Sequence, residues 1–477
     1  MKNQVLNPYL PSYEYVPDGE PHVFGDRLYI FGSHDRYGAK AFCENDYVCW
    51  SAPLDDLSDW RYDGIIYRKR QDPKNKILNS TMYAPDVCSG ADGRYYLYYG
   101  LNFLPVFGVA VCDTPAGTYE FLGHVRHPDG KLYGRGKNDA FPFDPGVLND
   151  DGRIYLCSGF SPKDGLMRRG IDALSRVKGA NGNQILELCG DMLTVKSVKP
   201  LIPGTDNSKG TGFEGHEFYE ASSLRKFNGK YYFIYSTVAS HELAYAVSEQ
   251  PDRGFRFGGV LHSNCDLGFN GNSRPLAFWG NNHGSIECIG GKYYVFGHRH
   301  TNYRECNRQG VAEELTGDGN GGFAMAEMTS CGLNGKPLGT GKYEAGIACN
   351  LFAASGAEKS VFFRDKAKTS LYPCIMQKGP DREGAPCQYI HNMRRGSVAG
   401  FKYFECDCTQ ITVTARSDGG TLEILFSPDG EPVAKIRLED SRDEAEYTTR
   451  LKIPGKQALY FRYAGEGSAD IMSFRLA

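Results

Sequence analysis

A turn followed by an aromatic run typical of a β-strand occurs five times between residues 25 and 296 of this 477-residue chain. Each copy starts at a glycine, passes a charged residue and continues into a run such as Tyr95-Tyr96-Leu97-Tyr98-Tyr99. Aromatic and β-branched runs between turn signals predict strands. The tyrosines that anchor the five copies are Tyr29, Tyr96, Tyr155, Tyr232 and Tyr294.

Successive anchors are 59 to 77 residues apart, which leaves room for four short strands in each repeat. Recurrence at such a period indicates repeated sheets rather than one sandwich. Small sheets packed radially form a propeller, which protects strand edges without closing a barrel. The sequence therefore predicts an all-β fold with a five-bladed β-propeller over residues 1–350.

A second regularity places one ionisable residue ten to twelve positions before each anchor. These residues are Asp18, Asp86, Asp144, Glu220 and His283. Each stands at the start of the strand before the aromatic one, and in a propeller this first strand lines the central axis. We therefore expect five polar side chains at equivalent positions in one axial funnel.

The sequence changes character at about residue 350, where the anchored repeats end. Short alternating strands separated by Gly and Asp turns follow, for example over residues 421–426 and 458–463. This pattern predicts a β-sandwich over residues 351–477. The only tryptophans are Trp50, Trp60 and Trp279, all in the propeller, so an accessory, pocket-shaping role suits the sandwich at least as well as carbohydrate binding.

Charge and cysteine content narrow the class of protein. The formal net charge of −3 gives no electrostatic reason to expect nucleic acid or a membrane as partner. No secretory h-region follows Lys2, and no apolar run is long enough to span a membrane. The 15 cysteines lack CxxC spacing, which favours reduced thiols and a cytoplasmic protein. The oligomeric state is left open, a homo-oligomer included.

Carboxyl groups that face one pocket suit the cleavage of glycosidic bonds. A protonated carboxylic acid gives a proton to the leaving oxygen, and an ionised carboxylate activates water or attacks directly. A third carboxylate nearby can set the two different pKa values that these roles need. Carboxylates on separate blades favour the wider separation that leads to inversion of the anomeric centre.

Several motifs resemble those of glycoside hydrolase family 43, a family of five-bladed propeller glycosidases. Residues 7–11 and 18–24 are similar to its opening, and Phe143-Asp144-Pro145 is similar to its second signature. Tyr83-Ala84-Pro85-Asp86 and Tyr219-Glu220-Ala221 match two further phrases. The resemblance covers residues 7–350. It implies that Asp18 is the general base, Asp144 the residue that modulates the pKa and orients the acid, and Glu220 the general acid.

Two departures from the family pattern leave alternatives open. Asp18 is followed by Gly19, and Glu20 rather than Asp18 comes directly before the proline, so Glu20 is a second candidate for the base. The usual Glu-Gly-Pro phrase is Glu220-Ala221-Ser222 here, and Glu217 is a second candidate for the acid.

The resemblance also suggests supporting residues. His283 would lie at the propeller centre and help to hold a cation or water, or else be a hydrogen-bonded core histidine. Arg308, with Arg304 as the alternative, would bind sugar hydroxyls and support the acid. Tyr83 would flank the pocket as a stacking surface or pack between blades, and Asp86 would be a positioning residue that contributes to substrate binding.

No cofactor is expected beyond a structural calcium or sodium ion near the axis, since the sequence contains no clustered metal-ligand motif. His34-Asp35 and His298-Arg299-His300 end the anchored strands, and we expect them to point away from the site. The preferred function is an inverting hydrolase that releases terminal xylose or arabinose from plant-derived oligosaccharides. The alternatives are a sugar-binding propeller without activity and a glycosidase acting on galactose or fructose linkages.

Overall fold

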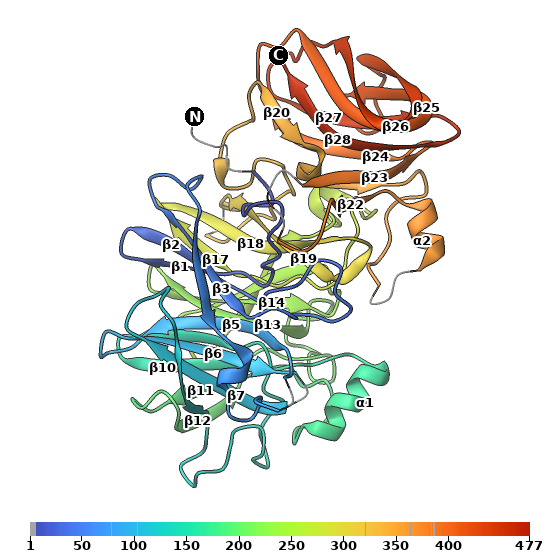
Figure 1. Ribbon diagram of the computed structural model, residues 1–477. Helices are drawn as coiled ribbons and strands as arrows, with labels where there is room; N and C mark the ends of the chain where they lie inside the picture. Colours follow the sequence, from blue (N-terminus) through green and yellow to red (C-terminus); the bar gives the residue numbers. More distant parts are fainter. Residues whose placement is uncertain are drawn as a thin grey trace.

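The computed structural model describes residues 6–477 except 78, 103, 320, 362–364, 383, 385 and 386. The chain forms a five-bladed propeller followed by a nearly closed, sandwich-like antiparallel β domain (Figure 1). Both predicted architectures are thereby confirmed. No helix among the described residues is long and apolar enough to cross a membrane.

The blades follow one another along the chain, and each is an antiparallel sheet in sequential strand order. The first four blades have four strands and the fifth has three among the described residues. The strands are β1 (Glu20–Phe24), β2 (Arg27–Phe31), β3 (Tyr47–Pro53), β4 (Arg61–Tyr67), β5 (Met82–Ser89), β6 (Tyr95–Leu101), β7 (Leu104–Cys112), β8 (Glu120–His124), β9 (Gly146–Asp150), β10 (Arg153–Ser158), β11 (Gln184–Leu188), β12 (Val195–Pro200), β13 (Phe218–Phe227), β14 (Lys230–Thr237), β15 (Glu242–Ser248), β16 (Arg256–Ser263), β17 (Ile286–Ile289), β18 (Lys292–Thr301) and β19 (Arg304–Leu315).

The aromatic repeat forms the second strand of every blade. In β6, Tyr96 and Tyr98 pack against residues of the third blade, whereas Tyr99 packs against residues of the first blade. Successive side chains of a strand point to opposite faces of the sheet. Because a neighbouring blade covers each face, the whole run is buried, and this explains why it is apolar and aromatic without alternation.

The ring is closed by the start of the chain. The Asn7 side chain donates a hydrogen bond to the Ala312 carbonyl and accepts one from the Ala312 N–H, both at 3.0 Å. Asn7 thus pairs with the outer edge of β19, where a fourth strand would lie in the other blades. Near the axis, a parallel bridge between Gly19 and Gly284 joins the first blade to the fifth.

The C-terminal domain is a sheet of nine strands. Strands β21, β24, β27, β25, β28, β23 and β22 follow in that order, while β20 pairs with β28 and β26 pairs with β25. Their bounds are β20 (Gly341–Glu344), β21 (Asn350–Phe352), β22 (Cys374–Gln377), β23 (Gln388–Arg394), β24 (Val398–Phe404), β25 (Gln410–Leu425), β26 (Ala434–Arg450), β27 (Gln457–Ala464) and β28 (Ser468–Leu476). The predicted division at residue 350 stays a prediction, and β20 before it already belongs to this sheet.

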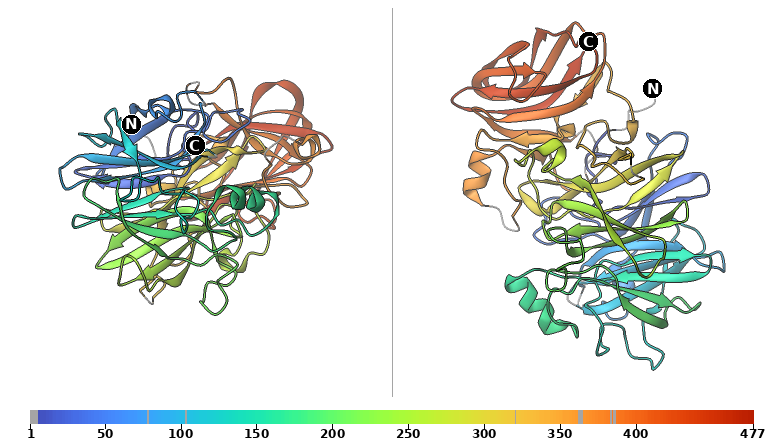
Figure 2. Two further views of the ribbon diagram at one scale, coloured as in Figure 1. Left: turned by 90° about the horizontal axis from the view of Figure 1, so that it is seen from below. Right: turned by 180° about the vertical axis from the view of Figure 1, so that it is seen from behind.

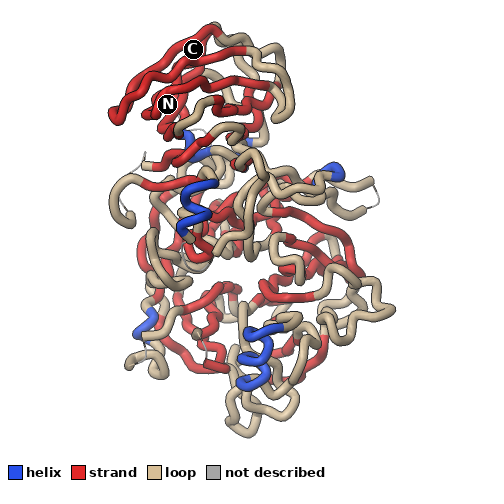
Figure 3. The backbone as a smooth tube through the Cα atoms, turned by 90° about the vertical axis from the view of Figure 1, so that its right-hand side faces the viewer, coloured by secondary structure: helices blue, strands red, loops and turns tan. Residues whose placement is uncertain are grey.

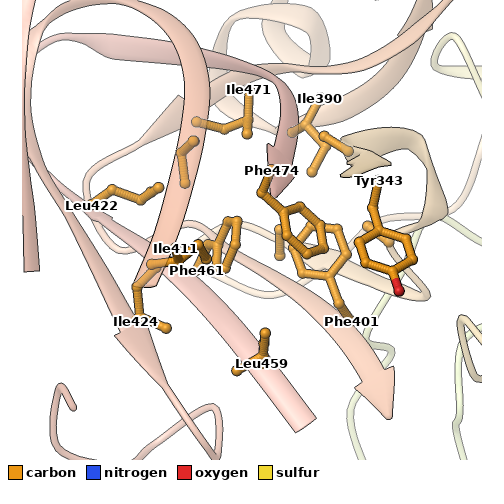
Figure 4. Close-up of a cluster of buried hydrophobic side chains, with 14 of the residues drawn as sticks. Tyr343, Ile390, Phe401, Ile411, Leu422, Ile424, Leu459, Phe461, Ile471 and Phe474 are labelled. Atoms are coloured by element: carbon orange, nitrogen blue, oxygen red, sulfur yellow. The ribbon is translucent and has the colours of Figure 1, made fainter. Parts of the chain in front are cut away.

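Apolar side chains from several strands fill the C-terminal domain (Figure 4). Phe401, Phe461 and Phe474 meet there with ring centroids 4.8 to 5.3 Å apart. Edge-to-face contacts at such distances add to the stabilisation gained from burial. The domain therefore has a hydrophobic core of its own.

The C-terminal domain packs on the propeller (Figure 2), and buried polar contacts join the two. Lys402 of β24 lies 3.0 Å from Asp266 and 2.9 Å from Glu327. Arg299 of β18 donates hydrogen bonds to the Gly346 carbonyl at 2.6 Å and to Gln388 at 3.0 Å. The two parts are therefore fixed to each other by the buried cations Lys402 and Arg299.

Helices are few and short. They are α1 (Gly165–Leu174), α2 (Lys366–Leu371) and the 3-10 turns η1 (Lys69–Gln71), η2 (Phe269–Gly271), η3 (Gly332–Asn334) and η4 (Ala345–Ile347). Helix α1 lies in the connection between β10 and β11 of the third blade. This connection leaves the blade at the same end at which Asp144 lies. Helix α2 of the C-terminal domain lies on the same face of the molecule (Figure 3).

Candidate active site

The backbone directs three carboxyl groups to the propeller axis. Asp18 and Asp144 each lie two residues before the first strand of their blade and adopt φ values of 57° and 43°, which non-glycine residues seldom do. The pairing of β13 with β14 shifts register on both sides of Glu220, and such a bulge re-aims a side chain. Local strain of this kind persists where the surrounding structure holds a side chain in place.

The first, third and fifth blades meet at His283. Its Nδ1 atom lies 3.4 Å from Asp144 and 3.9 Å from Asp18. The backbone N–H of Ala221 donates a hydrogen bond to Asp144 at 3.2 Å, which places Glu220 of the fourth blade beside that carboxylate. All four side chains are buried. The structure therefore brings Asp18, Asp144, Glu220 and His283 together at the axis, and we call this group the first axial layer.

Arg308 completes the first axial layer. It donates a hydrogen bond to Asp18 at 2.8 Å and two to Asp35, at 2.9 and 3.1 Å. The guanidinium also lies over the ring of Phe42, 4.8 Å from its centroid. The alternative, Arg304, lies at the turn between β18 and β19 and forms a bridge with Val361, so Arg308 is the arginine at the carboxylates.

The expectation that residues at the ends of the anchored strands point away from the site is wrong for Asp35 and His298. Asp35 holds Arg308, and His298 Nδ1 lies 3.2 Å from Asp18. In an antiparallel hairpin the end of the second strand lies beside the start of the first. Since β17 pairs with β18 through Ile286 opposite Val295, His298 comes level with His283. Hairpin register was the signal that could have found His298, whereas Asp35 reaches the site through its contact with Arg308 of the fifth blade.

The protonation states differ between the carboxyl groups. Burial alone would raise the pKa of Asp18, but the Arg308 guanidinium and His298 outweigh it and hold this pKa well below its usual range. Burial, together with the negative charges of Asp144 and Asp18, raises the pKa of Glu220 to about 8. Asp18 is therefore ionised and Glu220 protonated near neutral pH, as a base and an acid require.

Asp144 and His283 face each other at 3.4 Å between these two groups. Burial raises the pKa of Asp144, and the nearby His283 opposes this rise. Burial lowers the pKa of His283, but Asp144 and Asp18 outweigh it, and the pKa rises to about 9. The imidazolium thus offsets the repulsion between carboxylates that share one buried site.

Asp86 does not share the register of Asp18, contrary to the prediction from counting. Asp86 pairs with Tyr98 between β5 and β6, and Glu20 pairs with Phe31 between β1 and β2. Tyr98 and Phe31 each lie two residues after the anchor tyrosine of their blade. Tyr96 pairs with Cys88, eight residues before it, whereas Tyr29 pairs with His22, seven residues before it, so similar counts conceal different levels. Asp86 and Glu20 belong to a second axial layer, together with Ser223 and Ser285.

The contacts of Glu20 and Asp18 show which acidic residue faces Arg308. Glu20 accepts hydrogen bonds from Ser223 at 2.9 Å and from Arg225, whereas Arg308 bonds to Asp18. Glu217 accepts a hydrogen bond from Ser208 at 3.1 Å. The geometry therefore favours Asp18 and Glu220 over Glu20 and Glu217.

Sequence comparison agrees with this geometry. The profile described as "Glycosyl hydrolases family 43" matches residues 11–323. The chain belongs to glycoside hydrolase family 43. It is 48% identical to a xylosidase/arabinosidase of Thermoclostridium stercorarium, over 100% of this chain and 99% of the relative. It is 29% identical to a xylosidase/arabinosidase of Bacteroides ovatus, over 61% of this chain and 87% of the relative.

Solved structures agree in fold. An arabinoxylan arabinofuranohydrolase of family 43 from Bacillus subtilis has a TM-score of 0.52 at 18% identity, covering 99% of this chain and 97% of that one. A family 43 β-xylosidase/α-arabinofuranosidase from a compost metagenome, in complex with xylotriose and described as calcium-free, has a TM-score of 0.50 at 26% identity, covering 66% and 96%. The chain is therefore a glycoside hydrolase with the fold of its family.

In this family 43 enzyme, half-buried aromatic rings form a row beside the carboxyl groups of the first axial layer. Tyr83 contacts Phe143 with ring centroids 5.3 Å apart, Phe143 stacks on Phe160 at 4.5 Å, and Phe160 contacts Tyr219 at 5.4 Å. Phe143 precedes Asp144, and Tyr219 precedes Glu220 in the sequence. Tyr83 thus takes part in the row, and sequence reasoning missed Phe160 because it lies in a loop after β10.

Asp86 connects neighbouring blades. It is fully buried, its Oδ1 lies 2.7 Å from His22 Nε2, and its Oδ2 accepts a hydrogen bond from the Val147 N–H at 2.7 Å. These contacts tie the second blade to the first and third. They fit a positioning residue, and its part in substrate binding stays a prediction.

The second layer holds the one group of potential metal ligands found among the described residues. Oxygen and nitrogen atoms of Glu20, His22 and Asp86 lie within 4.8 Å of one another. However, the Arg225 guanidinium lies among them, bonded to Glu20 and 3.4 Å from His22. A calcium ion takes about six to eight oxygen ligands. A fixed positive charge in that place does not fit the expected structural cation.

Proposed function

We propose that this enzyme removes terminal xylose and arabinose from xylan-derived oligosaccharides with inversion at the anomeric carbon. The support for these sugars is the 48% identical xylosidase/arabinosidase, which matches the whole chain. The observation that carries the mechanism is the pairing of an ionised Asp18 with a protonated Glu220 on separate blades, since opposite protonation states at one site define a base and an acid.

In the proposed reaction, Asp18 accepts a proton from a water molecule while the water oxygen bonds to the anomeric carbon. The bond from that carbon to the leaving oxygen breaks as Glu220 gives its proton to this oxygen. Asp144 keeps the pKa of Glu220 high through its negative charge. Arg308, bonded to Asp18 and Asp35, fixes the direction of the base and presents a donor to sugar hydroxyls.

The aromatic row provides a surface for the sugar on the side of the acid. Phe143 and Tyr219 flank the acid because each directly precedes a catalytic carboxyl residue. The apolar face of a xylose ring can pack on such rings, while its hydroxyls reach polar groups. We therefore place the leaving part of the oligosaccharide along Tyr83, Phe143, Phe160 and Tyr219.

The test compares wild type and Glu220→Gln on aryl β-D-xylosides, aryl α-L-arabinofuranosides, aryl galactosides and linkage-defined xylo-oligosaccharides. Proton NMR during hydrolysis of a β-xyloside follows the first anomer released. We expect xylose and arabinose release, α-xylose as first product, and loss of turnover in the variant. Release of β-xylose would contradict inversion, and turnover of galactosides alone would contradict the proposed sugars.

We also propose a cytoplasmic location, where imported short oligosaccharides would be the substrate. In support, none of the 15 cysteines, all of which the structure describes, forms a disulfide bond, as expected in a reducing compartment. Fractionation of the native host followed by immunodetection tests this location. Light scattering during size-exclusion chromatography tests the homo-oligomer that the sequence leaves open.

A further inference from the structure

The second axial layer lies directly beneath the catalytic carboxylates. His283 connects the two layers, because its Nδ1 faces Asp144 while its Nε2 lies 3.9 Å from Glu20. Ser223 and Ser285 share a hydrogen bond of 2.7 Å across the fourth and fifth blades. Glu20 and Asp86 are buried. Burial raises the pKa of Glu20, but the Arg225 guanidinium bonded directly to it opposes this rise and favours the carboxylate, and two carboxylates in such a place need positive charge nearby.

Arg225 supplies that charge from the fourth blade. It is 5% exposed, and its Nη2 donates to Glu20 and to the Pro21 carbonyl, the latter at 3.3 Å. Its Nη1 lies 3.8 Å from Asp86. One guanidinium therefore reaches both carboxylates and a backbone carbonyl, which are the kinds of oxygen that a calcium ion would use.

Most carboxylate oxygens of the layer are already engaged. Asp86 Oδ1 faces His22 and the Val87 N–H, and Asp86 Oδ2 accepts from the Val147 N–H. Glu20 Oε2 accepts from Ser223 and Arg225. Among the described residues, Glu20 Oε1 is the only carboxylate oxygen of this layer without a hydrogen-bond partner. One free oxygen falls far short of a calcium coordination shell.

We propose that Arg225 is the resident cation of the propeller axis and takes the place of a metal ion beneath the active site. Arg225 is a positioning residue: it neutralises Glu20 and Asp86, and through Glu20 it keeps His283 between Asp144 and Asp18. The inference rests on the family and the contacts of this layer, and it is independent of which sugar the enzyme accepts.

The experiment begins with wild-type protein dialysed against EDTA and then against metal-free buffer. Elemental analysis measures bound calcium and other metals before and after dialysis, and thermal unfolding gives the Tm with and without added calcium chloride. We expect far less than one metal ion per chain, with Tm and kcat/KM on an aryl xyloside unchanged by EDTA or calcium. One tightly bound metal ion per chain whose removal lowers the Tm would overturn the proposal.

Variants test the charge directly. Arg225→Met removes the charge at similar length, and Glu20→Gln combined with Arg225→Met also removes the carboxylate that the charge offsets. We expect the single variant to lower the Tm by several degrees and the double variant to recover most of that loss. Arg253→Met, at an exposed arginine, is the matched control. A single variant with the Tm of this control would contradict the role of Arg225.

A third readout separates positioning from bulk stability. If Arg225 acts through Glu20 and His283, Arg225→Met changes the pH profile of kcat/KM even at temperatures where the variant is folded, and Arg225→Lys restores part of the wild-type profile. An unchanged profile would contradict the positioning role. If Arg225→Met does not fold, the metal content and EDTA response of the wild type still decide the proposal. The metal content and the Tm need no substrate, so these results are distinguishable from a failed sugar assignment.

Discussion

The guanidinium of Arg308 lies 2.8 Å from the carboxylate of Asp18, and both side chains are buried. Asp35 fixes the other side of the guanidinium with two hydrogen bonds. A buried positive charge at hydrogen-bonding distance favours the ionised form of a carboxyl group. Asp18 is thus kept as a carboxylate although burial alone would favour its protonation.

Replacing Arg308 should weaken the base. Arg308→Met removes the charge that lowers the pKa of Asp18, so this pKa rises and Asp18 becomes protonated at higher pH. We expect kcat/KM to fall about 100-fold, as when one electrostatic stabiliser is removed, and its acidic limb to move to higher pH. The pH profile of kcat/KM measures both effects. Arg304→Met is the control, and an acidic limb at the same pH in Arg308→Met and wild type would count against the prediction.

The alkaline side of the pH profile should report Glu220. Its pKa is raised to about 8, and the acid must be protonated to act, so activity should persist below that pH and fall as pH rises through it. Asp144→Asn removes a negative charge that raises this pKa, and the alkaline limb should move to lower pH. If the alkaline limb lies at the same pH in Asp144→Asn and in wild type, Asp144 does not raise the pKa of Glu220.

Leaving-group dependence offers a separate check on Glu220. Glu220→Gln cannot donate a proton, so substrates with poor leaving groups should lose at least about 100-fold in kcat, in line with general acid catalysis. A dinitrophenyl xyloside, whose leaving group needs little protonation, should lose much less. The comparison of the two substrates gives the answer, and equal losses on both would argue for a structural effect.

The aromatic row should contribute to binding of the leaving sugar. Phe160→Ala removes the ring that stacks on Phe143 at 4.5 Å and should raise KM for xylotriose about 2- to 10-fold, with a smaller effect on aryl xylosides. Phe121→Ala, on the outermost strand of the second blade, is the matched control. If KM for xylotriose is the same in both variants, the row does not bind substrate.

The junction between the two domains should be sensitive to charge. Lys402→Met leaves Asp266 and Glu327 without their buried partner, which should cost about 3–5 kcal/mol of unfolding free energy. Lys435→Met breaks an exposed pair with Glu423 and should cost at most about 1 kcal/mol. Urea unfolding measures both. Similar midpoints for the two variants would mean that the buried pair contributes little.

The repeat predicted the blades because an aromatic strand covered on both faces has a strong local signature. Asp18, Asp144, Glu220 and His283 followed from the same register. Asp86 was misplaced because one extra turn residue shifts a strand against its partner, and register depends on turn length as well as on spacing.

Other parts of the site depend on contacts between distant segments, which local patterns do not report. Asp35 reaches the site only through Arg308, 273 residues further along the chain, and Arg225 reaches Glu20 across 205 residues. Lys402 meets Asp266 only because the C-terminal sheet packs on the propeller. In the sequence these residues cannot be told from other polar residues, and only the fold shows their partners.

The pairing of Asn7 with Ala312 fastens the outer rim of the circle of blades, while the Gly19–Gly284 bridge fastens it near the axis. The Asn7 N–H also donates to the Ser330 carbonyl, and the Ser330 N–H donates to the carbonyl of Lys402 in β24. An exchange of the C-terminal module would therefore reach this fastening through Ser330, and extra residues inserted between Asn7 and β1 would pull on the loop that carries Asp18.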